Sequence, residues 1–148
     1  MNQSGKIEQC LQELGYVVLP IQGTSMWPLL REGKSRVQIA SMEGQPLRKG
    51  DLVLFKREDG TLVLHRIIKS KERGIFLVCG DHQWRQLESI REDQIRGVAQ
   101  GFYTNGNYID DTTGWYRIYK KIWNGNLVLR RFILAFLRIS GLERKQLQ

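Results

Sequence analysis

Three residues of this chain carry side chains that could together perform nucleophilic hydrolysis: Ser25, His65 and Asp81. Ser25 stands in the stretch "GTSMWPLL", directly before a Trp-Pro turn, where its hydroxyl could attack a carbonyl carbon. A histidine can take the serine proton near neutral pH, and a carboxylate can orient the imidazole and stabilise its charged form. The three residue types therefore match a hydrolytic triad, provided that the fold brings them together.

Each of these residues also has a purely structural interpretation. Ser25 could simply cap a loop, because turns take serine readily. His65 could be an ordinary packed core residue. Asp81 follows the strand-like run "FLVC" and could bond nearby backbone amides, as an aspartate at such a position often does.

The surroundings of His65 favour a role as a proton acceptor. It lies in the strand-like stretch "TLVLHRII", where period-two alternation places it on one face with Val63 and Ile67 and places Arg66 on the opposite face. An imidazole among β-branched neighbours is partly desolvated. Desolvation favours the neutral form, which can accept a proton near pH 7.

The composition limits the classes of protein to which this chain can belong. A chain of 148 residues, with 41% hydrophobic and 26% charged residues, fits one globular domain. The net charge of +8 favours anionic partners, namely nucleic acid, a membrane surface or an acidic peptide, without choosing among them. Two cysteines, Cys10 and Cys79, cannot form the framework of a disulfide-rich domain, so we expect reduced thiols.

We expect no metal and no other cofactor. A zinc site built from the two cysteines with His65 and His82 would lack the paired short spacings that zinc sites show. The N-terminal stretch contains Lys6, Glu8 and Glu13 and has no long apolar run, which predicts neither a signal peptide nor a membrane span. We therefore expect a cytoplasmic protein, and leave open a peripheral position on the inner face of the cell membrane.

The order of local patterns predicts a mainly β fold. Residues 1–15 favour a short helix with Ser4 as its cap, apolar residues at Ile7, Leu11 and Leu14, and Gly15 at its end. Residues 16–117 form the main domain, a coiled, partly closed antiparallel sheet that ends in a hairpin or loop with "NGN" at its tip. Its predicted strands are "YVVLP", "RVQIA", "DLVLF", "TLVLHRII", "IFLVC" and "IRGVA".

Residues 118–148 read as an amphipathic helical tail. On a helix, Arg130, Arg131 and Arg138 share one narrow face, and a broad apolar surface lies opposite. Two interpretations remain open, as does a mixture of the two. The helix could lie in the interface of an anionic membrane. It could instead cover an open face of the sheet and leave its arginines in water.

Aromatic and basic residues alternate just before and inside this tail. Such a mixture could stack on nucleic acid, but it more often forms the edge of a core or an anchor near a membrane helix. We therefore do not expect nucleic acid as a partner. The residues are Trp115, Tyr116, Arg117, Tyr119, Lys120, Lys121 and Trp123.

Four stretches of the chain resemble the conserved boxes of the signal-peptidase-like serine peptidases, the group of type I signal peptidases and LexA-type self-cleaving repressors. They are "GTSMWPLL", "LRKGDLVLFKREDGTLVLHRIIK", "FLVCGDHQ" and "IRGVAQG", in order from about Val18 to Gly101. The resemblance implies an all-β peptidase fold with Ser25 as the nucleophile. Most bacterial members use a lysine as the base; His65 stands here instead, which is similar to the endoplasmic-reticulum, archaeal and spore-associated branch.

The chain departs from this pattern where the imidazole should be oriented. The histidine branch has a further aspartate about six residues after its "GD" box, and Leu87 stands here at that position. Asp81 or the neighbouring Glu88 would then orient His65, or the triad is reduced to a dyad. Of these alternatives we favour Asp81.

Two further departures concern the oxyanion and the membrane. Members of the group often carry a serine two residues before the nucleophile, and Gly23 replaces it. Stabilisation of the oxyanion would then fall to backbone N–H groups at Ser25 and to the Thr24 hydroxyl, which is compatible with a slow enzyme. Signal peptidases also have an N-terminal membrane span that we do not find in this sequence; the C-terminal helix could replace it.

Three functional hypotheses follow. The first is a serine endopeptidase that cleaves a peptide or small precursor protein, bound as an extended strand. The second is a catalytically weak or inactive peptidase-like module that binds peptides or docks to a membrane. The third is a LexA-like self-cleaving regulator, although only about twenty residues precede Ser25, too few for a helical DNA-binding domain.

Overall fold

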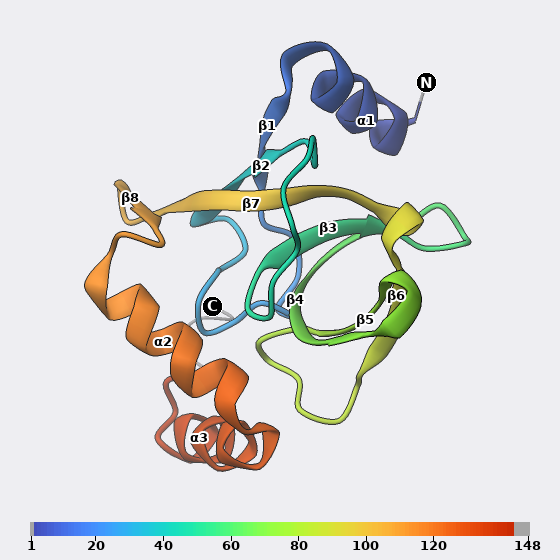
Figure 1. The fold of residues 1–148 in the computed structure, drawn as a ribbon. Coiled ribbons are helices and arrows are strands. Elements are labelled where there is room, and N and C mark those ends of the chain that lie inside the picture. The colour runs from blue at the N-terminus through green and yellow to red at the C-terminus, as the bar shows by residue number, and fades with distance from the viewer. Residues whose placement is uncertain (1, 144–148) are drawn as a thin grey trace.

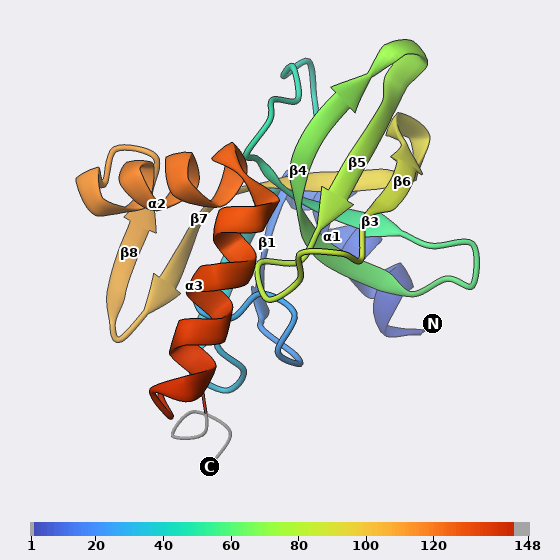
Figure 2. The ribbon, with the colours of Figure 1, turned by 90° about the horizontal axis from the view of Figure 1, so that it is seen from below.

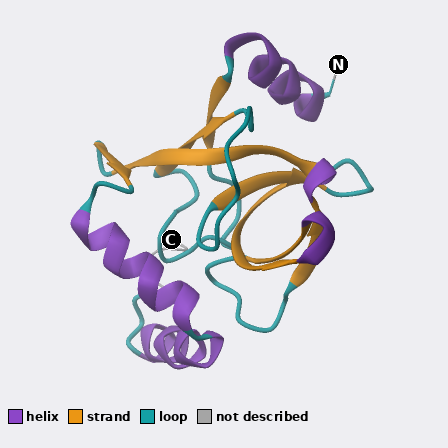
Figure 3. Ribbon diagram, in the orientation of Figure 1, coloured by secondary structure: helices purple, strands orange, loops and turns teal. Residues whose placement is uncertain are grey.

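The computed structural model describes residues 2–143. Within this range eight strands form one antiparallel sheet, with one helix before it and two after it (Figures 1 and 3). The elements are α1 (Gln3–Leu14), β1 (Tyr16–Pro20), β2 (Ser35–Ala40), β3 (Leu52–Lys56), β4 (Leu62–Lys71), β5 (Ile75–Cys79), β6 (Glu88–Arg91), β7 (Ile95–Thr104), β8 (Asn107–Asp110), α2 (Gly114–Gly125) and α3 (Leu127–Ile139), with short 3-10 turns at Glu72–Gly74 and Glu92–Gln94.

The sheet is coiled but not closed. Its strand order is β1-β2-β7-β3-β4-β5-β6, and β8 folds back on β7 as a hairpin. Figure 1 shows β4, β5 and β6 curling away from the long strand β7. Since no pairing joins the two end strands, β1 and β6, among the described residues, the predicted partial closure is corrected to an open sheet.

Most of the predicted β pattern is confirmed. Each of the six predicted runs forms a strand, and the hairpin expected after residue 101 forms around Asn105 and Gly106. The prediction missed β6, which has only four residues with a single buried side chain, Ile90. A short strand at the end of a sheet gives no clear alternation in sequence.

The N-terminal helix has a different N-cap residue from the one expected. The side chain of Asn2, not Ser4, accepts the backbone N–H of Gly5 at 2.8 Å. Ser4 lies inside α1, and its buried Oγ has no hydrogen-bond partner. The predicted end of the helix is correct, because Gly15 adopts a left-handed φ of 77° there, which glycine takes without steric cost.

Strand β3 divides the core between the two faces of the sheet. Leu52 and Leu54 pack into one hydrophobic cluster, and Val53 and Phe55 pack into the other. Strand β4 runs antiparallel beside it, with His65 opposite Val53 and Arg66 opposite Leu52. Directly opposed residues share a face, so neighbouring residues of β4 enter two different environments.

The predicted single C-terminal tail is two helices. Asn126 separates them, and its side chain caps α3 by accepting the backbone N–H of Val128 at 2.8 Å. Helix α2 begins at Gly114, before the expected boundary at residue 118. Residues 144–148 of the predicted tail lie outside the described residues. Within residues 2–143, no helix combines the length and the apolar character that a membrane crossing requires.

Helix α3 is oriented in a way that the sequence did not predict. Arg130 is fully buried, so the interpretation that leaves every arginine of the tail in water is wrong. Leu134 is also buried and packs with Trp27 and Trp123 beneath the helix. Figure 2 shows α3 lying across the end of α2, beside the loop that follows β5.

Candidate active site

The first half of β4 has an open backbone edge. Residues Leu62–Arg66 pair with β3 on one side, whereas pairing with β5 on the other side begins only at Arg66, opposite Cys79. The edge of Leu62–His65 that faces away from β3 therefore has no strand partner among the described residues. His65 is the last residue of this edge, next to the point where β5 ends.

His65 lies in an apolar environment. Its side chain is 4% exposed, and its ring meets that of Phe55 edge-on at 5.9 Å between centroids. Burial lowers the pKa of His65 to about 4, outweighing the charge of Glu88, which acts to raise it. The imidazole is therefore neutral at pH 7, and its buried Nδ1 has no hydrogen-bond partner. These properties suit a proton acceptor.

Ser25 lies in a compact turn between β1 and β2. The N–H of Trp27 donates to the carbonyl of Thr24 at 3.0 Å, and the N–H of Leu30 donates to that of Met26 at 2.9 Å. Met26 and Trp27 are buried and anchor the turn in the core, whereas Ser25 is only half-buried. The turn thus presents the serine at the surface on a fixed backbone.

A second turn, which directly follows β5, holds Ser25 beside the open edge. The N–H of His82 donates to the Ser25 carbonyl at 2.9 Å. A Cβ at Gly80 would lie 2.5 Å from the same carbonyl oxygen, closer than real Cβ atoms come, so this approach requires glycine. Because the turn leaves β5 next to His65, its contacts bring the serine into the neighbourhood of the histidine.

Ser25 and His65 line the same groove, which has a volume of about 680 Å³. No hydrogen bond joins the hydroxyl and the imidazole within the described part of the chain; such bonds are often long before substrate binds. The predicted nucleophile and base thus both line one groove. Its apolar walls come from α1, β1, the serine turn, β3 and β4, through Ile7, Leu19, Ile21, Met26, Leu54, Leu62, Val63 and Leu64.

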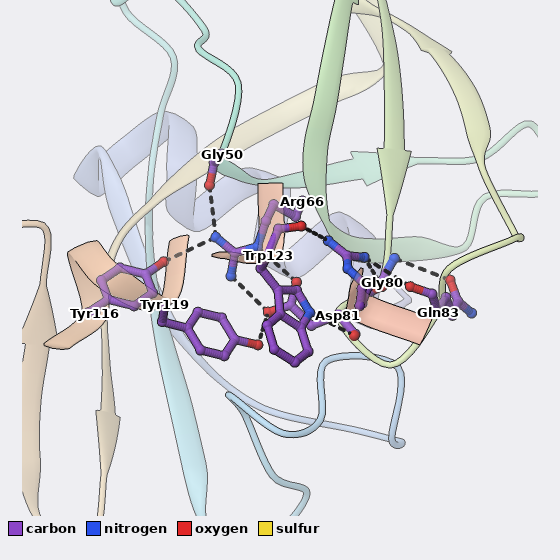
Figure 4. Close-up of polar contacts among 9 residues, drawn as sticks. Gly50, Arg66, Gly80, Asp81, Gln83, Tyr116, Tyr119 and Trp123 are labelled. Carbon is purple, nitrogen blue, oxygen red and sulfur yellow. Dashed lines mark hydrogen bonds and ion pairs between the residues drawn. The ribbon is translucent and has the colours of Figure 1, made fainter. Parts of the chain in front are cut away.

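Asp81 does not orient His65, and the prediction that it does is wrong for this structure. Its carboxylate is fully buried on the Arg66 side of β4 and accepts hydrogen bonds from Nε and Nη2 of Arg66, both at 2.8 Å (Figure 4). The hydroxyl of Tyr119 donates to Oδ2 at 2.8 Å. Three donors therefore occupy both carboxylate oxygens. Alternation along β4 turns Arg66 away from His65, so the carboxylate that pairs with Arg66 lies on the other side of the strand.

The alternative carboxylate, Glu88, is also engaged elsewhere. It accepts from Nε and Nη2 of Arg57 at 2.8 and 2.7 Å. Arg57 lowers the pKa of Glu88, so the carboxylate is charged at neutral pH. Its charge acts on His65 through space, but no hydrogen bond joins the two in the part of the chain that the structure describes.

The two residues expected to assist the oxyanion, Gly23 and Thr24, lie beside the nucleophile but face elsewhere. Both are exposed and line a second cavity of about 400 Å³, together with Trp27 and His82. Neither lines the groove of Ser25. Gly23 has a φ of 74°, which disfavours the serine that the resembling peptidases carry there. Their role at the oxyanion stays a prediction.

The buried pair is the centre of a network that ties the turn after β5 to the C-terminal helices. Nε1 of Trp123 donates to the backbone carbonyl of Asp81 at 2.9 Å. Nη1 of Arg130 donates to the carbonyls of Gly80 at 3.0 Å and Gln83 at 2.9 Å. Figure 4 shows Arg66, Tyr119 and Trp123 converging on Asp81. The turn that holds Ser25 on one side is therefore held by α2 and α3 on the other.

Sequence reasoning missed this supporting network. One signal for it was present, since an arginine at an alternate position of an interior strand must find a buried partner. The interpretation of the aromatic residues as the edge of a core holds for Tyr116 and Trp123, which are buried. The ring of Tyr119 stacks on that of Trp123, with 4.7 Å between the ring centroids. Trp115 is half exposed.

Comparison with known proteins adds no assignment. No protein-family model matches the chain, and no curated protein matches it. The chemistry of the site is therefore inferred from its own geometry and from the motifs quoted above.

We predict that the protein loses stability as the pH is lowered from 6.5 to 4, because of His65. Its pKa is about 4 in the folded chain against 6.5 for an ordinary histidine, so the unfolded chain binds this proton more readily. The free energy of unfolding should rise between pH 4 and 6.5, by up to about 3 kcal/mol from this residue. Urea unfolding of wild type and His65→Gln at pH 4.5 and 7.5 measures the difference. An equal pH dependence of the free energy of unfolding in wild type and His65→Gln would contradict the assignment.

We also predict that Asp81→Asn lowers stability by about 3–5 kcal/mol, because it leaves the buried Arg66 guanidinium without its counter-charge. The control Asp111→Asn breaks an exposed ion pair with Lys120 and should cost less than about 1 kcal/mol. Urea unfolding at neutral pH compares the two. A small loss for Asp81→Asn would show that the pair does not support the fold.

Proposed function

We propose that this protein is a serine endopeptidase with Ser25 as nucleophile and His65 as general base. One observation carries the proposal: a half-buried serine on a rigid turn and a buried, neutral histidine line the same groove. Nδ1 of His65 makes no hydrogen bond, so the ring is not committed to a structural role by a polar partner.

In the proposed reaction His65 takes the proton of the Ser25 hydroxyl as the oxygen attacks the scissile carbonyl carbon. The C–N bond then breaks, and the histidine gives the proton to the leaving amine. A water molecule, activated by the same histidine, hydrolyses the acyl ester and restores the serine. The low pKa of His65 keeps the imidazole unprotonated at neutral pH but also makes it a weak base. We therefore expect slow turnover.

An extended peptide is the substrate form that the groove suits best. The free backbone edge of Leu62–His65 offers unpaired N–H and C=O groups, to which a peptide strand can add. The apolar groove walls would receive its side chains. We further propose, from the resemblance, that small residues precede the cleaved bond.

The proposed fold family is that of the signal-peptidase-like serine peptidases. Three of the four resembling boxes supply neighbouring parts of the site: the serine turn, the His65 strand and the turn after β5. The coiled antiparallel sheet is compatible with this family.

A second candidate is a peptidase-like module that binds peptides without efficient cleavage. The observation that favours it is the absence, among the described residues, of any carboxylate hydrogen-bonded to His65. In this case the groove would bind the same extended peptides, and Ser25 would contribute little.

We predict that the wild type cleaves members of a library of extended peptides, whereas Ser25→Ala and His65→Gln do not. Products are identified by mass spectrometry. The acid limb of kcat/KM should lie near pH 4, because His65 must be neutral to act as base. Ser89→Ala, an exposed serine on β6, is the control and should cleave like the wild type.

The outcomes separate the hypotheses. Identical products from wild type and Ser25→Ala would overturn the peptidase proposal. Peptide binding without cleavage would support the module. Truncation of the purified protein itself on incubation at alkaline pH would identify a self-cleaving regulator instead.

We predict that Gly80→Ala slows cleavage by about 10²-fold, because its methyl group would displace the Ser25 carbonyl and with it the nucleophile. The matched control is Gly125→Ala, since a Cβ there meets no atom within 4 Å. Steady-state kinetics should show the loss in kcat. Unchanged kinetics in a folded Gly80→Ala protein would mean that the turn does not position Ser25.

A further inference from the structure

Helix α3 presents an apolar face to solvent. Phe132, Phe136 and Ile139 are 64%, 69% and 86% exposed, and Val128 and Leu129 are exposed beside them. These five residues share one face of the helix, because Phe132 lies three and four positions from Leu129 and Val128, and Phe136 and Ile139 follow at the same spacing; we call them the α3 apolar face. Contiguous exposed apolar surface of this kind marks a site of interaction.

The α3 apolar face cannot turn inward without breaking buried hydrogen bonds. Arg130, on the opposite side of the helix, is fully buried and donates to the carbonyls of Gly80, Gln83 and Trp123 at 2.8 to 3.0 Å. Leu134 is buried on the same side. The helix is thus attached to the body of the protein by its arginine side, and its apolar side is left without a partner among residues 2–143.

Helix α2 also exposes apolar side chains. Trp115, Ile118 and Ile122 share one face of α2 and are exposed. A tryptophan with an apolar body and one polar atom is typical of residues at the boundary between lipid and water. Both C-terminal helices therefore carry exposed apolar side chains.

The charged residues of the two C-terminal helices have a single sign. The sequence from Gly114 to Leu142 contains six basic residues and no acidic one. Four of the six are exposed: Arg117, Lys121, Arg131 and Arg138. An apolar face on helices whose charged residues are all basic complements an anionic lipid surface, where acyl chains and phosphate groups lie close together.

A second copy of the chain fits this surface poorly. In a symmetric dimer the same patch meets itself, so Arg131 and Arg138 would approach their own copies with no acidic residue on either helix to neutralise them. The charge pattern therefore favours lipid over self-association.

We propose that the α3 apolar face binds the interface of an anionic membrane, with Phe132, Phe136 and Ile139 among the acyl chains and the exposed basic residues at the headgroups. The arrangement makes the protein a peripheral membrane protein that lies on one leaflet. This inference does not depend on the peptidase proposal, because it concerns residues outside the groove.

Co-sedimentation with vesicles tests the proposal. The full chain should bind vesicles of phosphatidylcholine with phosphatidylglycerol at least about tenfold more tightly than vesicles of phosphatidylcholine alone, and added salt should weaken binding. Ser25→Ala should bind equally well, which separates this result from any result on cleavage. Equal binding to both vesicles, or none to either, would overturn the proposal.

Two surface variants locate the contact. Phe132→Ser with Phe136→Ser, and separately Arg131→Gln with Arg138→Gln, should each weaken binding by about tenfold or more. Leu14→Ser removes an equally exposed apolar residue from α1 and should bind like wild type. Full binding by the phenylalanine variant overturns the assignment. Self-association in gel filtration that this variant abolishes would identify a second copy as the occupant and also overturn it.

Discussion

The ion pair between Arg66 and Asp81 is the interaction on which the arrangement of this protein depends. Both side chains are completely excluded from solvent, and removing two charges from water costs several kcal/mol for each ion. Such a pair is tolerated only when its geometry is good and its remaining donors are satisfied. Arg66 also donates to the Gly50 carbonyl at 2.9 Å, and Tyr119 donates to Asp81, so loops and helix α2 must pack around the pair.

The pair also fixes a turn that has two neighbours. Asp81 lies within the turn after β5, which contacts the Ser25 backbone through His82 and contacts helix α3 through Arg130. The C-terminal helices therefore support the candidate site through the turn after β5, and none of their residues lines the groove. They are attached by guanidinium and indole groups that donate to backbone carbonyls and by the buried side chains of Trp123 and Leu134, while the α3 apolar face is left exposed.

The fold was largely predictable because alternation in the strands is a local property. The period of two in "TLVLHRII" placed His65 and Arg66 on opposite faces, and the structure agrees. The partner of Asp81 was not predictable from the same pattern, because pairing across the sheet is set by how β4 and β5 meet. The position of Asp81 at the end of an apolar strand did not identify its partner either, because the aspartate was equally suited to His65.

The C-terminal helix shows a different limit of sequence reasoning. The amphipathic pattern of α3 was read correctly, but a pattern shows two unlike faces and does not say which one is buried. Apolar faces usually turn inward, and here Arg130 reverses that rule because three backbone carbonyls accept its hydrogen bonds. The helix break at Asn126 has a local signal, a capping side chain, whereas the direction of packing has none.

The neutral His65 and the charged Arg66 are adjacent on β4, and this affects the register in which β4 pairs with β3. A shift of one position against β3 would carry the guanidinium of Arg66 into the apolar side occupied by Phe55 and would leave Asp81 facing an imidazole. Both misplacements bury uncompensated charge. The dipeptide His65-Arg66 therefore favours a single alignment of the hairpin, and Arg66, which does not line the groove, keeps His65 in its place there.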